Sequence, residues 1–416
     1  MKDDSLGPLA PYRVLDLTGE LALYCGKLLG DLGADVVIVE PPGGHPARAI
    51  GPFYQDRPHP ECSLFWLTFN TSKRSITLDI ETPDGQDLLR RLVASAHFLV
   101  ESFPVGYLDS LGLGYRQLSV VNPSLIMASV TPFGQTGPYS HWQTSELVGQ
   151  AMGGIQYIVG DAERAPVQLG GLQVHLYGGI EAAEACLIAH HYRLNTGEGQ
   201  YIDLGLQHGV AAGMGITGPH ESWDLNRVIF PRAGIPYDQG PIFGVAPRHN
   251  VVVPCKDGYF AMSHYRCPVA PLVDWMAPDG YQHLKERKWS SDTVDYLTRE
   301  EREVLDPAVL DFLTTKSKTE IYRESLRRRL PWAPIQTPSD LLSHPHLKAR
   351  GFLVNVEHPE LGASFAYAGA PAALSETPWR IQRRAPLIGE HNSEVYVEEL
   401  GLSLRDLTRL KAGGII

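Results

Sequence analysis

The chain has 416 residues, of which 43% are hydrophobic and 20% charged, and its formal net charge is −11 at pH 7. This composition is typical of a globular protein long enough to form two domains. The negative charge argues against a nucleic-acid partner and against binding to an anionic membrane surface.

Signals for targeting and for metal binding are missing from the sequence. No apolar run reaches the about 18 residues of a membrane span, and the first residues do not form a signal-peptide pattern. The five cysteines are scattered without a CxxC pair. We therefore expect a cytoplasmic protein with no membrane contact, no disulfide framework and no metal site.

The first forty residues predict a β-α-β unit. Residues 13–18 alternate in polarity as a strand does, and residues 22–32 carry apolar side chains at helical spacing. Residues 34–40, ADVVIVE, form a β-branched run typical of a strand buried on both faces. The pattern indicates an α/β fold that begins a parallel, doubly wound sheet, although no GxGxxG follows the first strand.

Alternating strands and helices continue to about residue 217. The expected elements are extended runs at 64–70 and 74–80, a helix from Thr82 to about residue 95, strands at 97–103 and 125–134, a helix at 145–155 capped by Thr144 or Ser145, and a strand passing into a helix at 200–213. Two basic groups stand out between them. Lys73-Arg74 could contact a phosphate or form a solvated pair, and His45 with Arg48 follows a strand end where α/β proteins bind ligands.

His175 lies between two glycine pairs, in PVQLGGLQVHLYGGIEAA at 166–183, just ahead of an alanine-rich helix. Paired glycines allow the backbone to approach another group closely because no Cβ intervenes. On residue type alone, His175 suits a general base, a nucleophile or a packed core histidine. Glu146 at the start of the preceding helix suits either helix-dipole stabilisation or a role in a site.

The composition and periodicity of the sequence change near residue 218. Residues 218–250 are rich in glycine and proline without a sustained period, which predicts a linker. The elements expected beyond it are a hairpin turning at 256–258, helical segments at 269–287, 292–302 and 317–329, a second hairpin turning at 360–362, and helices to the end of the chain.

Several collinear blocks resemble the family III CoA-transferases, the group that contains formyl-CoA and carnitine CoA-transferases and α-methylacyl-CoA racemase. The blocks include VLDLT at 14–18, LLGDLGADVVIVEPPGG at 28–44, FNTSKRSITLDIETPDG at 69–85, NPSLIMASVTPFGQTGPY at 122–139, NTGEGQYIDLGL at 195–206 and APLIGEH at 385–391. They follow the family's order, with residues 218–330 only loosely matched.

The resemblance implies an architecture that the residues alone do not. Family members have a large Rossmann-like domain built from both chain ends, a small central α+β domain, and two subunits interlocked like linked rings. By this resemblance we expect residues 1–217 and 331–416 to form the large domain, the latter beginning with a return linker. Residues 218–330 would supply the other linker and the small domain.

The resemblance also implies a covalent mechanism in which an aspartate attacks an acyl-CoA thioester. The carboxylate forms an anhydride and then a thioester with coenzyme A, and only an acid can do both. Counting back from Gly179, the family aspartate falls at His175. No residue of this chain is therefore expected to be the nucleophile, while Glu146 matches an acidic position of the family active site.

The resemblance places coenzyme A or an acyl-CoA, as substrate, against five residues: Leu21, Ala22, Leu78, Asp79 and Phe103. Family cations that meet its phosphates are replaced by Glu81 and Ser110, and Pro41 and Ser102 also depart from the pattern. The coenzyme A site is thus expected to be degenerate, with coenzyme A bound mainly by a partner subunit.

Three readings follow. In the first, this chain is the silent subunit of a heteromer such as benzylsuccinate CoA-transferase, moving CoA from succinyl-CoA to an aryl-bearing acid with a homologous aspartate-bearing subunit, in an interlocked heterodimer or heterotetramer. In the second, His175 and Glu146 flank an α-carbon as in an acyl-CoA racemase or epimerase, although the racemase histidine falls at Ser145. In the third, His175 forms an acyl-imidazole.

Overall fold

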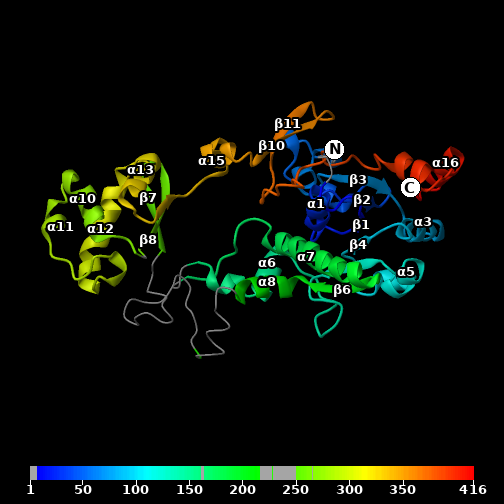
Figure 1. Cartoon of the computed structure of the whole chain (residues 1–416), viewed down its shortest axis with the longest axis horizontal. Coiled ribbons are helices and arrows are strands. Elements are labelled where there is room, and N and C mark those ends of the chain that lie inside the picture. The colour runs from blue at the N-terminus through cyan, green and yellow to red at the C-terminus, as the bar shows by residue number, and fades with distance from the viewer. Residues whose placement is uncertain (1–6, 161–163, 216–226, 228–249, 265) are drawn as a thin grey trace. The chain divides into compact units, whose positions relative to one another are not determined.

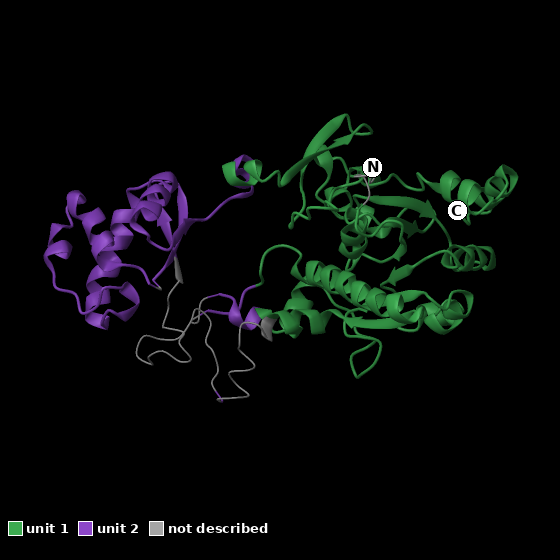
Figure 2. Cartoon of the chain, viewed as in Figure 1, with its two compact units in different colours: residues 1–155, 168–217, 345–416 green, residues 156–167, 218–344 purple. Residues whose placement is uncertain are grey.

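The computed structural model describes residues 7–160, 164–215, 227, 250–264 and 266–416. The chain divides into two units (Figure 2): unit 1 contains residues 1–155, 168–217 and 345–416, and unit 2 contains residues 156–167 and 218–344. Each unit has its own hydrophobic core. Most of the predicted linker at 218–250 lies outside the described residues, and the division of the chain at 217 and 330 stays a prediction.

A six-stranded parallel sheet forms the centre of unit 1 (Figure 1). Its order is β3-β2-β1-β4-β5-β6, the order of a doubly wound nucleotide-binding sheet. The strands are β1 (Arg13–Leu17), β2 (Asp35–Glu40), β3 (Lys73–Thr77), β4 (Phe98–Glu101), β5 (Ile126–Thr131) and β6 (Gln200–Gly205). This confirms the predicted α/β class and the parallel sheet.

Helices cover both faces of this sheet. Because side chains alternate along a strand, Val14 and Val36 pack with α1 and α7 on one face, whereas Leu15 and Val37 pack with α3 and α16 on the other. The helices of unit 1 are α1 (Leu23–Asp31), α2 (Leu64–Phe69), α3 (Pro83–Val93), α4 (Tyr107–Ser110), α5 (Tyr115–Val121), α6 (Glu146–Met152), α7 (Gln173–Thr196), α8 (Leu206–Gly215), α15 (Pro345–Ala349), α16 (Leu404–Ala412) and a π-helix at Glu394–Glu399.

Two local predictions for unit 1 are wrong. Residues 64–69 form a helix, α2, rather than an extended run, because the Ser63 hydroxyl caps it by accepting from the Trp66 N–H at 3.1 Å; short apolar runs do not reveal their period. The helix α7 begins at Gln173, so His175 lies in its first turn and not ahead of it. The hairpin of β10 (Leu353–His358) and β11 (Ala363–Ala368) is as predicted, with Gly362 at φ +60°.

Unit 2 contains a three-stranded antiparallel sheet of order β7-β8-β9. The strands are β7 (Asn250–Cys255), β8 (Gly258–Ser263) and β9 (Trp332–Pro334), and the helices are α10 (Val269–Met276), α11 (Gln282–Glu286), α12 (Arg299–Thr314), α13 (Lys318–Arg328) and α14 (Pro338–Ser343). The predicted turn between β7 and β8 is confirmed. The helix expected at 292–302 instead begins at Arg299, where Thr298 and Glu301 form a capping box, and runs to Thr314.

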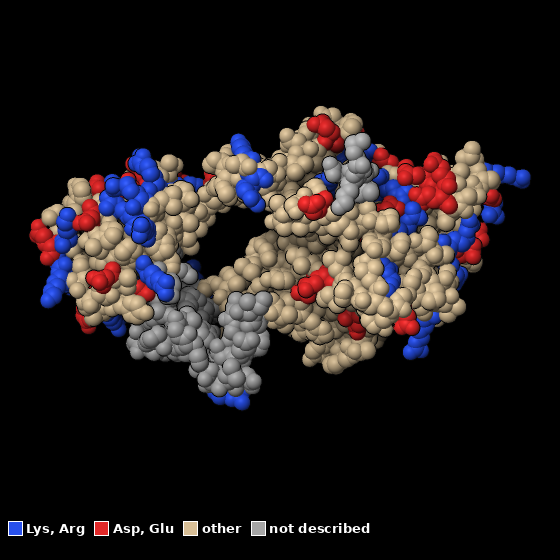
Figure 3. Space-filling view, viewed as in Figure 1, with Lys and Arg blue, Asp and Glu red and all other residues tan. Residues whose placement is uncertain are grey.

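The surface carries both signs of charge. On the face drawn in Figure 3, basic and acidic side chains are interspersed over each unit. Within the described residues, no helix is long and apolar enough to cross a membrane.

Candidate functional site

Glu146 and His175, 29 residues apart in sequence, are in direct contact. Glu146 is the first residue of α6, whose N-terminus is capped by the Ser145 hydroxyl accepting from the Val148 N–H at 3.3 Å. His175 lies in the first turn of α7, and its Nδ1 is 2.8 Å from Oε2 of Glu146. The Val174 N–H donates to both carboxylate oxygens, at 3.0 and 3.1 Å. Glu146 therefore holds the imidazole and also caps α7 with a negative charge, which the helix dipole favours.

The surroundings of Glu146 keep its carboxylate ionised. Burial raises the pKa of Glu146, but hydrogen bonds from His175, Gln150 and the Val174 N–H outweigh it and lower the pKa overall. An ionised carboxylate accepts only, so Nδ1 of His175 carries the proton in this contact. The other ring nitrogen, Nε2, is then the one that is not bound to Glu146.

A cavity of about 1030 Å³ opens beside the pair. His175 and Glu146 line it, as do aromatic side chains from several elements: Tyr24, Phe65, Phe69, Tyr367 and Trp379. Lys27 also lines it, but its ammonium is paired with Asp31 at 2.6 Å and donates to Thr71 at 2.8 Å. The cavity is thus largely apolar, with the imidazole of His175 at its wall.

Two glycines bring α7 close to its neighbours. A Cβ added to Gly178 would lie 2.1 Å from Leu206 Cδ2, and one added to Gly179 would lie 2.6 Å from Tyr24 Cβ. At Gly178 the leucine end could shift, whereas a Cβ at Gly179 would also lie 3.0 Å from the Cys25 backbone nitrogen, so packing and not positive φ favours glycine there. The glycine pair after His175 therefore fixes the position of the helix that carries it.

A second cavity, of about 650 Å³, lies at the carboxyl ends of β1, β2 and β4. In doubly wound sheets ligands bind at this edge, where the strand order reverses between β1 and β4. The Gly19 N–H donates to Ser102 Oγ at 2.6 Å across that position. Leu78, Asp79 and Phe103 line the cavity, as expected of coenzyme A contacts, whereas the described lining does not include three other residues singled out for this site: Leu21, Ala22 and Ser110.

The described lining of this second cavity is acidic. It includes Glu20, Asp79 and Glu81 but no lysine or arginine. Tyr107 donates its hydroxyl to Glu81 at 2.8 Å, and burial together with this contact raises the pKa of Tyr107 to about 12. His45 is the remaining group that could become cationic, but burial lowers its pKa. This set of side chains does not fit the phosphates of coenzyme A, which need cations or free backbone N–H groups.

Lys73 and Arg74 are neither a phosphate-binding pair nor a solvated pair, as the two predictions had it, because both side chains are buried and ion-paired. Lys73 Nζ is 2.7 Å from Asp16 Oδ2, with both side chains fully buried. Arg74 contacts three carboxylates, those of Asp35, Glu394 and Glu399. These cations hold strands and the C-terminal segment together, and they do not face a ligand.

The loop after β2 contains one buried, ion-paired residue, Arg48, and one residue that lines a cavity, His45. Arg48 is buried against Glu40 at 2.6 Å and stacks on Trp66, with its guanidinium carbon 3.7 Å from the ring centroid. His45 lines the second cavity and contacts the Thr18 carbonyl at 3.0 Å. Of this predicted cluster, only His45 reaches a cavity.

Sequence reasoning missed three contributors to these sites: Gln150, Tyr107 and the Val174 N–H. Gln150 follows Glu146 by four residues and donates to it at 2.7 Å, a helical spacing that could have identified it. The Tyr107 and Val174 contacts join separate segments, so no local pattern signals them. Among the described residues, no group of three His, Cys, Asp or Glu side chains is placed to hold a metal ion.

Comparisons with known proteins give one consistent result. A family model described as CoA-transferase family III matches residues 9–392. The chain is 36% identical over 397 residues to the succinyl-CoA:(R)-benzylsuccinate CoA-transferase subunit BbsE of Thauera aromatica, covering 93% of each chain. It is 33% identical over 415 residues to the succinyl-CoA–D-citramalate CoA-transferase of Chloroflexus aurantiacus, covering 98% of each.

A solved structure agrees with these sequence relatives. A CAIB/BAIF family protein from Brucella suis matches with a TM-score of 0.81 and 27% sequence identity. The match covers 94% of this chain and 99% of that one. The similarity therefore extends through both units.

Proposed function

The chain belongs to CoA-transferase family III, and from this membership we propose that it is a non-catalytic subunit of a heteromeric CoA-transferase. In this proposal, a homologous subunit supplies the nucleophilic aspartate and the main coenzyme A site. This chain completes an interlocked heterodimer or heterotetramer and shapes the substrate cavity. The proposal rests on His175, which by the family resemblance stands where the mechanism needs a carboxylate, and on its contact with Glu146.

The chemistry of His175 supports the proposal that this chain does not itself catalyse the family reaction. An aspartate can form an anhydride and then a thioester with coenzyme A, whereas an imidazole accepts an acyl group but cannot carry coenzyme A as a thioester. His175 is also bound to Glu146 at 2.8 Å.

The acidic lining of the second cavity supports the proposal that the partner subunit, and not this chain, holds the main coenzyme A site. Glu81 lines it where the family resemblance implies a lysine. Two like unit charges about 4 Å apart repel by about 1 kcal/mol in bulk water and by more where water is excluded. The phosphates of coenzyme A would meet this repulsion from Glu81, and from Asp79 beside it.

Exposed apolar side chains on α7 support the proposal that a partner subunit binds this chain. Ile180, Ile188 and Leu194 are 47%, 65% and 66% exposed, and Tyr192 is 44% exposed. Exposed apolar side chains, where they gather into a patch, mark protein–protein contacts. One relative is named as a subunit, and an interlocked dimer would cover a large area of such surface.

The substrates follow from the relatives and from the larger cavity. Both reported relatives are named for succinyl-CoA, and one is named for benzylsuccinate. The aromatic side chains around His175 suit an aryl-bearing acid, because rings pack edge to face with such groups. We therefore assign succinyl-CoA as donor and an aryl-bearing carboxylic acid, such as benzylsuccinate, as acceptor.

The deciding experiment compares this chain alone with this chain co-expressed with its aspartate-bearing homologue. Succinyl-CoA and (R)-benzylsuccinate are supplied, and formation of the new thioester is measured. We expect no transfer by the chain alone and transfer by the purified complex. Transfer by the chain alone would refute the proposal.

A second candidate function is acid–base catalysis on an acyl-CoA, as in a racemase or epimerase. The observation in its favour is the Glu146–His175 pair beside the cavity of about 1030 Å³, which resembles a histidine base oriented by a carboxylate. The contact leaves no space for a carbon between the two groups, so His175 would act alone at its Nε2. Exchange of the α-hydrogen of a 2-methylacyl-CoA in deuterated water tests this function, and its absence excludes it.

A further inference from the structure

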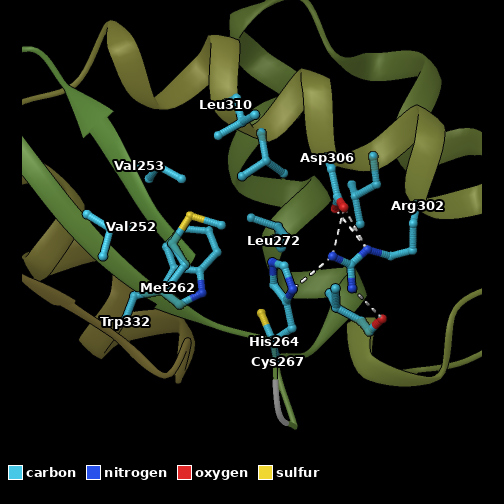
Figure 4. Close-up of a pocket in the computed structure, with 13 residues that line it drawn as sticks. Val252, Val253, Met262, His264, Cys267, Leu272, Arg302, Asp306, Leu310 and Trp332 are labelled. Carbon is cyan, nitrogen blue, oxygen red and sulfur yellow. Dashed lines mark hydrogen bonds and ion pairs between the residues drawn. The ribbon is translucent and has the colours of Figure 1, made fainter. Parts of the chain in front are cut away.

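Unit 2 contains a cavity of its own, of about 360 Å³ (Figure 4). It lies between the sheet strands β7, β8 and β9 and the helices α10 and α12. Its lining is mostly apolar and includes Met262, Leu272, Val309 and Trp332, with Cys267 beside them. A cavity of this size is at the small end of ligand pockets, which measure about 300–1,000 Å³.

One hydrogen-bond donor in this cavity has no strong acceptor. The indole N–H of Trp332 is buried and has no partner within ordinary hydrogen-bond geometry among the described residues, although it interacts with the sulfur of Cys267. Burial raises the pKa of the nearby Cys267 thiol to about 12, although Trp332 and Arg302 act in the opposite direction. The sulfur is therefore a neutral thiol at neutral pH, which is a weak acceptor. A buried donor without a partner costs about 1–3 kcal/mol, so it needs an explanation.

The charges at the polar end of the cavity balance one another. Arg302 donates to Asp306 through Nε at 2.9 Å and through a terminal nitrogen at 2.7 Å, and it contacts His264 Nδ1 at 2.8 Å. Figure 4 shows these three side chains joined along one side of the cavity. The guanidinium of Arg302 is thus matched by the carboxylate of Asp306, and a neutral ligand avoids the cost of burying a further charge.

We propose that this cavity binds a small neutral molecule with an apolar body and one hydrogen-bond acceptor, such as an aryl ketone, whose oxygen accepts from Nε1–H of Trp332. The apolar body occupies the space between Met262 and Leu272. This site is separate from the cavity at His175, since its lining belongs to unit 2 alone. Its occupation does not depend on the transferase proposal.

The test uses the full chain and two probes of nearly equal shape, 4-fluoroacetophenone and 4-fluoroethylbenzene, titrated by fluorine NMR. The ketone has the acceptor and the hydrocarbon lacks it. We expect both to bind, and Trp332→Phe to weaken the ketone about fivefold, the worth of one hydrogen bond, without changing the hydrocarbon. Trp275→Phe is the matched control, because Trp275 packs in the same core but does not line the cavity.

Two cavity-filling variants locate the probes. Val309→Phe and Leu272→Phe each place a ring in the cavity and are expected to weaken both probes at least tenfold. Two variants are used because overpacking destabilises some cores by about 1–3 kcal/mol, and circular dichroism identifies a variant that remains folded. Binding that is unchanged in the folded filled variant, or weakened equally for both probes by Trp332→Phe, would overturn the proposal.

Discussion

The carboxylate of Glu146 lies 2.8 Å from the imidazole of His175 and accepts in addition from the backbone N–H of Val174. One side chain from α6 thus orients the ring on α7 and satisfies a backbone donor at the start of that helix. The imidazole is in this way fixed by the packing of two helices. Its structural role can be measured separately from any chemistry.

Glu146→Gln is expected to destabilise unit 1 by about 1–2 kcal/mol. The variant keeps an oxygen for one hydrogen bond but removes the charge that favours the N-terminus of α7 and the charge-assisted contact with His175. Urea denaturation followed by circular dichroism measures the change. Glu184→Gln, at an exposed position of the same helix, is the control and should alter stability by less than about 0.5 kcal/mol.

Glu146→Gln is also expected to change how the free energy of unfolding depends on pH. Because contacts with His175, Gln150 and Val174 lower the pKa of Glu146 in the folded state, its stabilising contribution is complete above its unfolded pKa of about 4.3. The contribution is lost as the pH falls through the lower folded value. Wild type should therefore lose more stability than Glu146→Gln between about pH 6 and about pH 3. Equal losses would contradict the assignment of an ionised Glu146.

Lys73→Met is expected to destabilise the protein by about 3–5 kcal/mol, because it leaves the buried Asp16 carboxylate without its ion pair. The double variant with Asp16→Asn should be less destabilised than the sum of the single variants. The surface substitution Lys411→Met serves as control, with a change within about 0.5 kcal/mol. The denaturant midpoint of unfolding is measured for wild type, the two single variants Lys73→Met and Asp16→Asn, the double variant and the control. A change below about 1 kcal/mol for Lys73→Met would show that the ion pair is not structural.

Glu81→Lys is expected to raise the affinity of this chain for coenzyme A by roughly tenfold at low salt, because a repulsion from phosphate becomes an attraction. Equilibrium dialysis measures the dissociation constant, and added salt should reduce the gain. Glu398→Lys makes the same charge change at an exposed position away from the acidic cavity and should leave affinity nearly unchanged. If both variants gain equally, net charge and not this cavity governs binding.

Ile188→Asp is expected to prevent assembly with the aspartate-bearing subunit, because Ile188 is 65% exposed on α7 and a charge buried at the proposed interface would lack a partner. Light scattering of the co-expressed chains measures assembly. Val120→Asp, at an 82% exposed position on α5, is the matched control and should assemble normally. Assembly of Ile188→Asp with unchanged mass would place the partner elsewhere.

Local patterns were sufficient for much of the fold. Residues 13–40 identify the first β-α-β unit, and the turns near Gly258 and Gly362 identify two hairpins, because these elements are defined by neighbours in sequence. Collinear blocks from residue 14 to residue 391 identify the family. The parallel sheet then follows, since strands separated by helices pair in parallel.

Other features depend on partners distant in sequence. Residues 64–69 look extended until the Ser63 cap is known, and Lys73 looks exposed until Asp16, 57 residues away, is placed beside it. Spacing shows which groups are charged, but burial and pairing decide whether a charge faces solvent, a ligand or another side chain.

The place of His175 at the family aspartate stays a prediction, made by counting back from Gly179. Its contact with Glu146 could not be predicted, because the two residues are 29 apart in sequence and tight packing around Gly179 helps to place α7. The chain order therefore predicts which residue replaces the family nucleophile. Long-range packing determines what that residue touches, because the free energy of the contact comes from groups brought together only when the sheet and its helices assemble.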